Sequence, residues 1–185
     1  SMQWLMMRVE MGTATSEDFA QVRQWLPSQH FDAQAILGIR HMVDRLTETP
    51  AEGAVYLDEM LELLDTLEEL PRYRAVPVFN RLLPYLRGKL MLAQGRPLDA
   101  KHQMLDAINQ YRETDAALSI VADVANAGYQ AQALDLLDAA REVYQTQDTS
   151  TLKRSRAVYD MEFQRLKELL EDDVRQRADE AGGGE

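Results

Sequence analysis

Two stretches of this chain repeat one another at an offset of 33 residues, and this repeat constrains the fold more than any other feature. Residues 84–112 align with residues 117–145. The matched pairs are Gly95 with Gly128, Ala100 with Ala133, Met104 with Leu137, Ala107 with Ala140, and Tyr111 with Tyr144. Small residues at fixed places let two helices approach closely, while the larger residue fills the space beside them. The repeat therefore predicts antiparallel helical hairpins stacked on copies of themselves.

The Gly95-Arg96-Pro97 segment is interpreted as the bend of a repeated unit rather than as a phosphate-binding loop. A phosphate loop would need a preceding strand and a longer glycine-rich run that contains Lys and Ser or Thr. At the equivalent bend we expect Gly128 to adopt a left-handed backbone conformation, which glycine tolerates best.

The rest of the chain is also predicted to be helical, because no segment alternates apolar and polar residues as a strand would. Glycine, proline and capping residues divide the chain into helices at about 3–11, 16–26, 32–47, 51–70, 74–94, 98–112, 115–127, 130–146 and 151–178. Ser16 opens the second helix without a full capping box. Pro84 predicts either a kink or a break between residues 81 and 85.

The stretches "LAQGRPLDAKHQMLDA" and "NAGYQAQALDLLDAA" resemble the tetratricopeptide repeat family, most clearly over residues 84–145. In that resemblance Gly88 matches the small position of the first helix, and Gly95 and Gly128 close the first helices. The second-helix positions are matched by Ala100, Met104 and Ala107 in one unit and by Ala133, Leu137 and Ala140 in the next. The resemblance implies an all-α, right-handed solenoid of helical hairpins with about nine helices.

The domain organisation follows from the same resemblance. Residues 1–2 are interpreted as an expression scar, residues 3–178 as a single repeat domain, and residues 179–185 as a disordered tail. Residues 16–47 and 51–83 are expected to be repeat-like hairpins. Residues 151–178 are expected to form a capping helix. Its inward-facing residues are predicted to be Leu152, Val158, Met161, Leu166, Leu169 and Leu170.

The composition argues against several classes of function. A net charge of -11 disfavours nucleic-acid binding, and a chain with no cysteine has no thiolate metal site or cysteine nucleophile. No apolar run is long enough to cross a membrane. Asp99, His102 and Asp106 could share a helix face as metal ligands, but we interpret them as a solvated face, and His30 and His41 as surface residues. We expect no enzyme activity, metal or cofactor.

The charged residues are unevenly distributed along the chain. Residues 51–70 carry seven acids and no base. The segment that follows is basic and contains Arg72, Arg74, Arg81, Arg87, Lys89, Arg96, Lys101 and Arg112. Either these bases pair with neighbouring helices or remain solvated, or they present a groove to an acidic or C-terminal segment of a partner. The resemblance places such a groove along the first helices, at Tyr85, Lys89, Leu92, Leu118, Ala122 and Asn126, with Arg87 in the basic segment.

The function expected from these features is a non-catalytic scaffold for protein or peptide partners. We expect a soluble domain of a larger bacterial protein in an envelope, exopolysaccharide or pilus assembly. It would be cytoplasmic rather than periplasmic, with a parent protein anchored in the inner membrane. One alternative is a regulatory sensor that binds a peptide or small effector. Another is a self-association module that pairs through the N-terminal "WLMMRVEM" segment to form a homo-oligomer.

Overall fold

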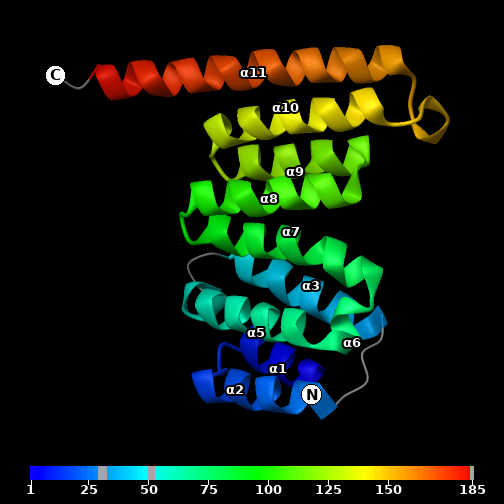
Figure 1. Ribbon diagram of the computed structural model, residues 1–185. Helices are drawn as coiled ribbons and strands as arrows, with labels where there is room; N and C mark the ends of the chain where they lie inside the picture. Colours follow the sequence, from blue (N-terminus) through cyan, green and yellow to red (C-terminus); the bar gives the residue numbers. More distant parts are fainter. Residues whose placement is uncertain (29–32, 50–52, 184–185) are drawn as a thin grey trace. The chain divides into compact units, whose positions relative to one another are not determined.

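A computed structural model describes residues 1–28, 33–49 and 53–183, and in these ranges the chain is helical and contains no strand. The α-helices are α1 (Met2–Glu10), α2 (Ser16–Trp25), α3 (Ala33–Glu48), α5 (Leu57–Glu69), α6 (Pro71–Arg74), α7 (Pro77–Ala93), α8 (Pro97–Tyr111), α9 (Thr114–Asn126), α10 (Gln130–Thr146) and α11 (Arg156–Gly182) (Figure 1). Short 3-10 helices lie at η1 (Leu26–Ser28), η2 (Ala54–Tyr56) and η3 (Thr149–Thr151). The prediction of an all-α protein is confirmed.

The chain divides into two compact units, Ser1–Arg96 and Pro97–Glu185, here called unit 1 and unit 2. Each unit is described by itself. The single repeat domain over residues 3–178 and its right-handed solenoid arrangement therefore stay predictions.

Unit 1 is built from helices that pack in pairs around one hydrophobic core. α1 packs against α2 and α3, α2 packs against α5, and α7 packs against both α3 and α5. The side chains that close this core come from every one of these helices, and they include Leu5, Phe19, Ile39, Leu64 and Leu86. Their removal from water is the main source of stability for such a helical assembly.

α2 begins at Ser16, as predicted, but its N-cap is Thr15 rather than Ser16. The Thr15 hydroxyl accepts a hydrogen bond from the Asp18 backbone N–H at 3.3 Å, and the Thr15 N–H donates to the Asp18 carboxylate at 2.9 Å. These two hydrogen bonds form a complete capping box. The prediction from the sequence missed it because it assigned the cap to Ser16, and the residue three positions after Ser16 is Phe19.

The predicted helix at 74–94 is divided, although not at Pro84. α6 ends at Arg74 and α7 begins at Pro77, so the division lies at residues 75–76. Proline is well suited to the first turn of a helix, where its missing N–H has no intrahelical acceptor. Pro84 is buried inside a continuous α7, so the alternative of a break at residues 81–85 is wrong.

Unit 2 contains both copies of the predicted pattern, in which two small alanines flank a larger apolar residue. α10 packs against α8, α9 and α11. The patterned side chains on α8 and α10 are all buried: Ala100, Met104, Ala107, Ala133, Leu137 and Ala140. Gly128 has a φ of +94° and Gly95, in unit 1, has a φ of +72°, so the prediction of a left-handed turn is confirmed.

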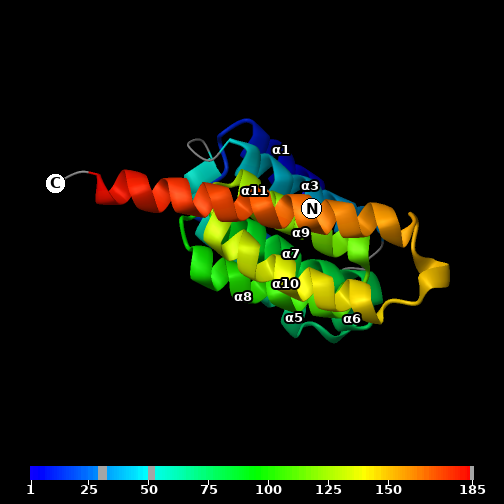
Figure 2. The same cartoon turned by 90° about the horizontal axis from the view of Figure 1, so that it is seen from above.

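The C-terminal helix corrects three predictions. α11 begins at Arg156, after the Ser155 cap, rather than at residue 151, and it ends at Gly182 rather than at 178. Residues 179–182 are therefore helical rather than a disordered tail, because alanine and glutamate continue the helix well. Residues 184–185 lie outside the described residues. Figure 2 shows that the C-terminal part of α11 extends past the end of α10.

The inward face of α11 also differs from the prediction. The buried side chains are Tyr159, Phe163 and Leu170, whereas Val158, Met161 and Leu169 are exposed. Tyr159 and Phe163 place their ring centroids 5.5 Å and 5.3 Å from that of Tyr144 on α10. Aromatic side chains bury more area than aliphatic ones, so this face of the helix turns inward.

Candidate functional site

The predicted partner-binding bases on α7 are engaged within unit 1. Arg87 Nη2 lies 2.6 Å from Asp65 Oδ1 and also pairs with Glu68, both on α5. Only 14% of the Arg87 side chain is exposed. Burial alone would lower the pKa of Arg87, but the hydrogen bonds to Glu68 and Asp65 raise it above its ordinary value. Arg87 therefore joins α7 to α5.

Lys89 makes a similar connection from α7 to α3. Its Nζ lies 2.5 Å from Asp44 Oδ1 and 5.7 Å from the ring centroid of Tyr85. Leu92 is buried. These contacts favour the interpretation in which the bases pair with neighbouring helices, and a role in partner binding stays a prediction.

The other predicted groove residues lie on α9, in unit 2. Ala122 and Asn126 are exposed, while Leu118 is buried. Lys101, on α8 of the same unit, pairs with Asp135 on α10 at 3.0 Å. A single groove that runs along both α7 and α9 remains a prediction, since the two helices belong to different units.

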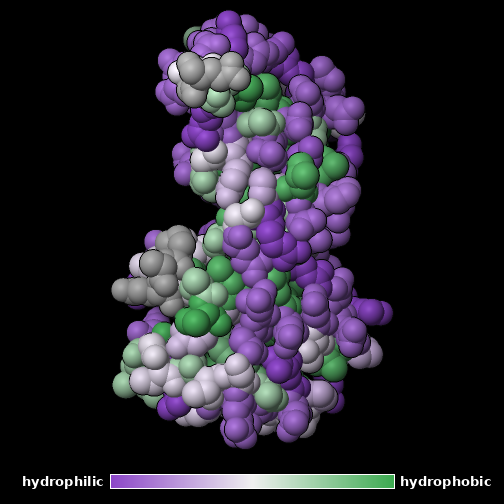
Figure 3. All heavy atoms as spheres, turned by 90° about the vertical axis from the view of Figure 1, so that its left-hand side faces the viewer, coloured by the Kyte–Doolittle hydropathy of each residue, from purple (hydrophilic) through white to green (hydrophobic). Residues whose placement is uncertain are grey.

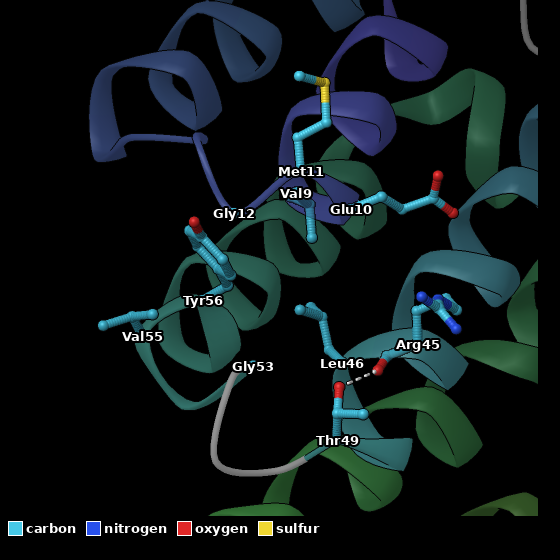
Figure 4. Close-up of a pocket in the computed structure, with 10 residues that line it drawn as sticks. All are labelled: Val9, Glu10, Met11, Gly12, Arg45, Leu46, Thr49, Gly53, Val55 and Tyr56. Atoms are coloured by element: carbon cyan, nitrogen blue, oxygen red, sulfur yellow. Dashed lines mark hydrogen bonds between the residues drawn. The ribbon is translucent and has the colours of Figure 1, made fainter.

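A cavity of about 360 Å³ opens in unit 1 between the C-terminal ends of α1 and α3 and the short helix η2 (Figure 4). Val9 and Leu46 are buried and point toward one another across it (Figure 4). At the edge, Met11 and Val55 are 67% and 76% exposed. On the face of unit 1 drawn in the lower part of Figure 3, hydrophobic side chains lie between hydrophilic ones. The cavity thus has two buried apolar side chains at its floor, exposed apolar side chains at its edge, and the polar side chains of Glu10, Arg45 and Thr49 in its lining.

Two glycines shape this cavity. Gly12 ends α1 with a φ of +69°, so the chain turns sharply away at the cavity rim. A Cβ atom on Gly53 would lie 2.4 Å from the Leu46 carbonyl oxygen. Only glycine lets the chain that enters η2 pass this close to the end of α3.

The charged groups at the cavity differ in their pairing. Glu10 Oε1 lies 3.2 Å from His41 Nε2, across α1 and α3. Among the described residues, none forms an ion pair with the guanidinium of Arg45, which also lines the cavity. Arg45 is therefore available to bind a carboxylate beside the apolar floor.

The sequence predicts Val9, Glu10 and Met11 only as part of a self-association segment, and it indicates none of the other cavity residues as a site. Gly12, directly after an apolar helical segment, is a recognisable helix-ending glycine and could have marked the turn. The approach of Gly53 to Leu46 depends on tertiary packing and leaves no local signal.

The predicted metal alternative on α8 gains no support from the structure. Asp99, His102 and Asp106 are exposed, and the described part of the chain holds no group of three acidic or histidine side chains placed to bind a metal ion. His41 contacts Glu10, and His30 lies outside the described residues.

An ionic cluster ties α11 to α9 within unit 2. Arg154 lies 2.8 Å from Asp115 and 2.5 Å from Glu162, and the Tyr159 hydroxyl donates to Asp115 at 2.8 Å. Burial would raise the pKa of Asp115, but the hydrogen bonds from Tyr159 and Arg154 hold it below its ordinary value. This cluster stabilises the fold around Ser155, the cap of α11.

Comparisons with protein-family models, with curated proteins and with solved structures found no match for this chain. Within the described ranges, no helix combines the length and apolar character that crossing a bilayer requires.

Proposed function

We propose that this chain is a non-catalytic protein-interaction module of the tetratricopeptide type, and that the cavity in unit 1 anchors a segment of its partner. The observation that carries the proposal is the apolar floor at Val9 and Leu46 beside Arg45, whose guanidinium has no ion-pair partner among the described residues. Pockets that combine apolar walls with a few polar groups are the usual form of a binding site.

The chemistry of the cavity favours a peptide with one apolar side chain next to a carboxylate. The apolar side chain would displace water from Val9 and Leu46, and the carboxylate would pair with Arg45. A C-terminal residue or an acidic side chain could supply that carboxylate. This proposal moves the expected binding site from the α7 bases, which pair internally, to the end of α3.

The resemblance to tetratricopeptide repeats supports a scaffold, because the buried alanines of α8 and α10 give the close helix contacts that such repeats use. A place in a bacterial envelope, exopolysaccharide or pilus assembly rests on that resemblance alone.

Peptide display is the direct test of the proposal. Two libraries of random peptides would be selected on the purified protein, one that displays free C-termini and one that displays the peptides within a longer chain. The dissociation constant of an enriched peptide would then be measured by fluorescence anisotropy. We expect Arg45→Ala to weaken binding by about tenfold or more, because a hydrogen bond to a charged group contributes about 1.5–3 kcal/mol. Arg40→Ala, on the same helix but outside the cavity lining, is the matched control and should bind as the wild type does.

A second pair of variants tests the apolar edge. Val55→Glu should weaken binding, while Val78→Glu, at an exposed position of α7 in the same unit, should not. If no peptide is enriched, or if each cavity variant binds as tightly as its control, the proposed function is wrong. Saturable binding of small metabolites without peptide binding would favour a sensor instead.

A further inference from the structure

α11 presents a second apolar face, separate from the one that packs on α10. Val158, Met161 and Leu169 are 44%, 74% and 56% exposed. At 3.6 residues per turn, this stripe lies about 120° around the helix from the buried Tyr159, Phe163 and Leu170. The exposed stripe of Val158, Met161 and Leu169 is called the outer stripe.

The order of residues along the outer stripe and its edge is self-complementary. Val158 and Leu169 are equally distant from a midpoint between residues 163 and 164. In an antiparallel pair of identical helices centred there, Val158 of each copy meets Leu169 of the other, because the two residues also lie within about 20° of one another around the helix.

Two charged residues on the same face as the outer stripe obey the same symmetry. Glu162 and Arg165 are also equally distant from the midpoint between residues 163 and 164, so an antiparallel pair brings opposite charges together twice. Arg165 has no ion-pair partner among the described residues, and Glu162 pairs with Arg154 through one carboxylate oxygen. A carboxylate accepts several hydrogen bonds, so Glu162 can bind Arg165 of a second copy as well. A parallel pair would instead place like charges side by side.

We propose that the outer stripe is a homodimer interface in which α11 pairs antiparallel with α11 of a second copy. A two-fold interface requires one surface to be complementary to itself, and a partner of different sequence would have no reason to match this symmetry. The surface differs from the N-terminal segment for which self-association was predicted, and it is separate from the cavity in unit 1.

Disulfide trapping tests both the pairing and its direction, because the chain contains no cysteine of its own. Val158→Cys and Leu169→Cys are made as separate variants. In the antiparallel pair Cys at 158 meets Cys at 169 of the second copy, whereas identical positions are displaced by about 16 Å along the axis. A disulfide requires Cα atoms within about 7 Å.

We expect a disulfide-linked dimer when the two variants are mixed under mild oxidation, and little when either is oxidised alone. Dimers from each variant alone, with no gain on mixing, would indicate a parallel pair and overturn the proposal. An absence of linked dimer in every sample would overturn it as well.

Sedimentation equilibrium tests the energetics without cysteine. Leu169→Glu and Arg165→Glu should each raise the dimer dissociation constant at least tenfold. The control Leu98→Glu, at an exposed position of α8 in the same unit, should leave it unchanged. Circular dichroism checks that each variant is folded. A monomeric wild type at all concentrations, or equal effects of Leu98→Glu and Leu169→Glu, would contradict the interface. Because peptide binding in unit 1 is measured separately, a failure here leaves the proposed function standing.

Discussion

The turn at Gly128 permits a prediction whose size can be worked out from the backbone. Two hydrogen bonds close α9: the Gly128 N–H donates to the Ala125 carbonyl at 2.9 Å, and the Tyr129 N–H donates to the Val124 carbonyl at 3.2 Å. This Schellman pattern requires a left-handed residue, and Gly128 has a φ of +94°. A Cβ atom at this position would meet nothing within 4 Å. The cost of Gly128→Ala is therefore conformational and not steric.

The magnitude follows from two opposing effects. The left-handed conformation costs a residue such as alanine about 1–2 kcal/mol. Alanine also restricts the unfolded chain, which offsets about 0.4–1 kcal/mol. We therefore expect Gly128→Ala to lower the free energy of unfolding by about 1 kcal/mol, and the melting temperature by roughly 2–4 °C for a chain of this length.

Urea denaturation followed by circular dichroism measures this loss, and Gly38→Ala is the matched control. Gly38 lies inside α3, and a Cβ atom there would also meet nothing within 4 Å. Since its φ is not positive, alanine should stabilise the helix by about 0.5–1 kcal/mol. An unchanged stability for Gly128→Ala, or a change of the same sign in both variants, would refute the reasoning.

Three further predictions use the same measurement. Ala140→Leu should lower the free energy of unfolding by about 1–3 kcal/mol, because the site is fully buried among packed helices; a neutral result would contradict the close helix contact. Gly53→Ala should cost more than Gly128→Ala, since its Cβ would collide with the Leu46 carbonyl oxygen; an equal or smaller loss would mean that the end of α3 yields easily. Asp115→Asn should destabilise the protein at neutral pH, and this loss should shrink as the pH falls below about 4. The pKa of Asp115 is lowered in the folded state, so its contribution is present above the unfolded pKa and disappears as the carboxylate is protonated; a loss that does not vary with pH would argue against the ionic role.

The glycine turns and the buried alanines could be predicted from the sequence because their signals are local. Glycine at a helix end and alanine at fixed intervals reflect backbone conformation and close packing within one hairpin. The predicted bounds of α10 agree with the structure at both ends, and the pattern residues predicted on α8 and α10 are all buried. The same local logic found the left-handed turn at Gly128.

The inward face of α11 was predicted wrongly because this helix carries two sets of apolar residues, and both sets have helical spacing. On α11 the aliphatic set was predicted to face inward, but contacts with Tyr144 on α10 select Tyr159 and Phe163. The sequence of α11 alone does not contain that partner. The cavity in unit 1 was missed for a similar reason, since it depends on the approach of Gly53 to Leu46.

The charge pattern left two interpretations open, and the distances favour one of them. Arg87 and Lys89 each lie within ion-pair distance of acids on neighbouring helices, at separations in sequence that no periodicity predicts. Such pairs become visible only when the helix order is known. Arg45, by contrast, lies outside the basic segment, so the charge pattern did not predict a role for it.

Methyl chemical-shift mapping of a display-selected peptide tests the central claim most directly. The claim predicts saturable shifts for the methyl groups of Val9, Leu46 and Val55 at the cavity, with those of Leu98 unchanged. Shifts confined to unit 2, or the same response to a scrambled peptide, would contradict a partner-binding cavity in unit 1.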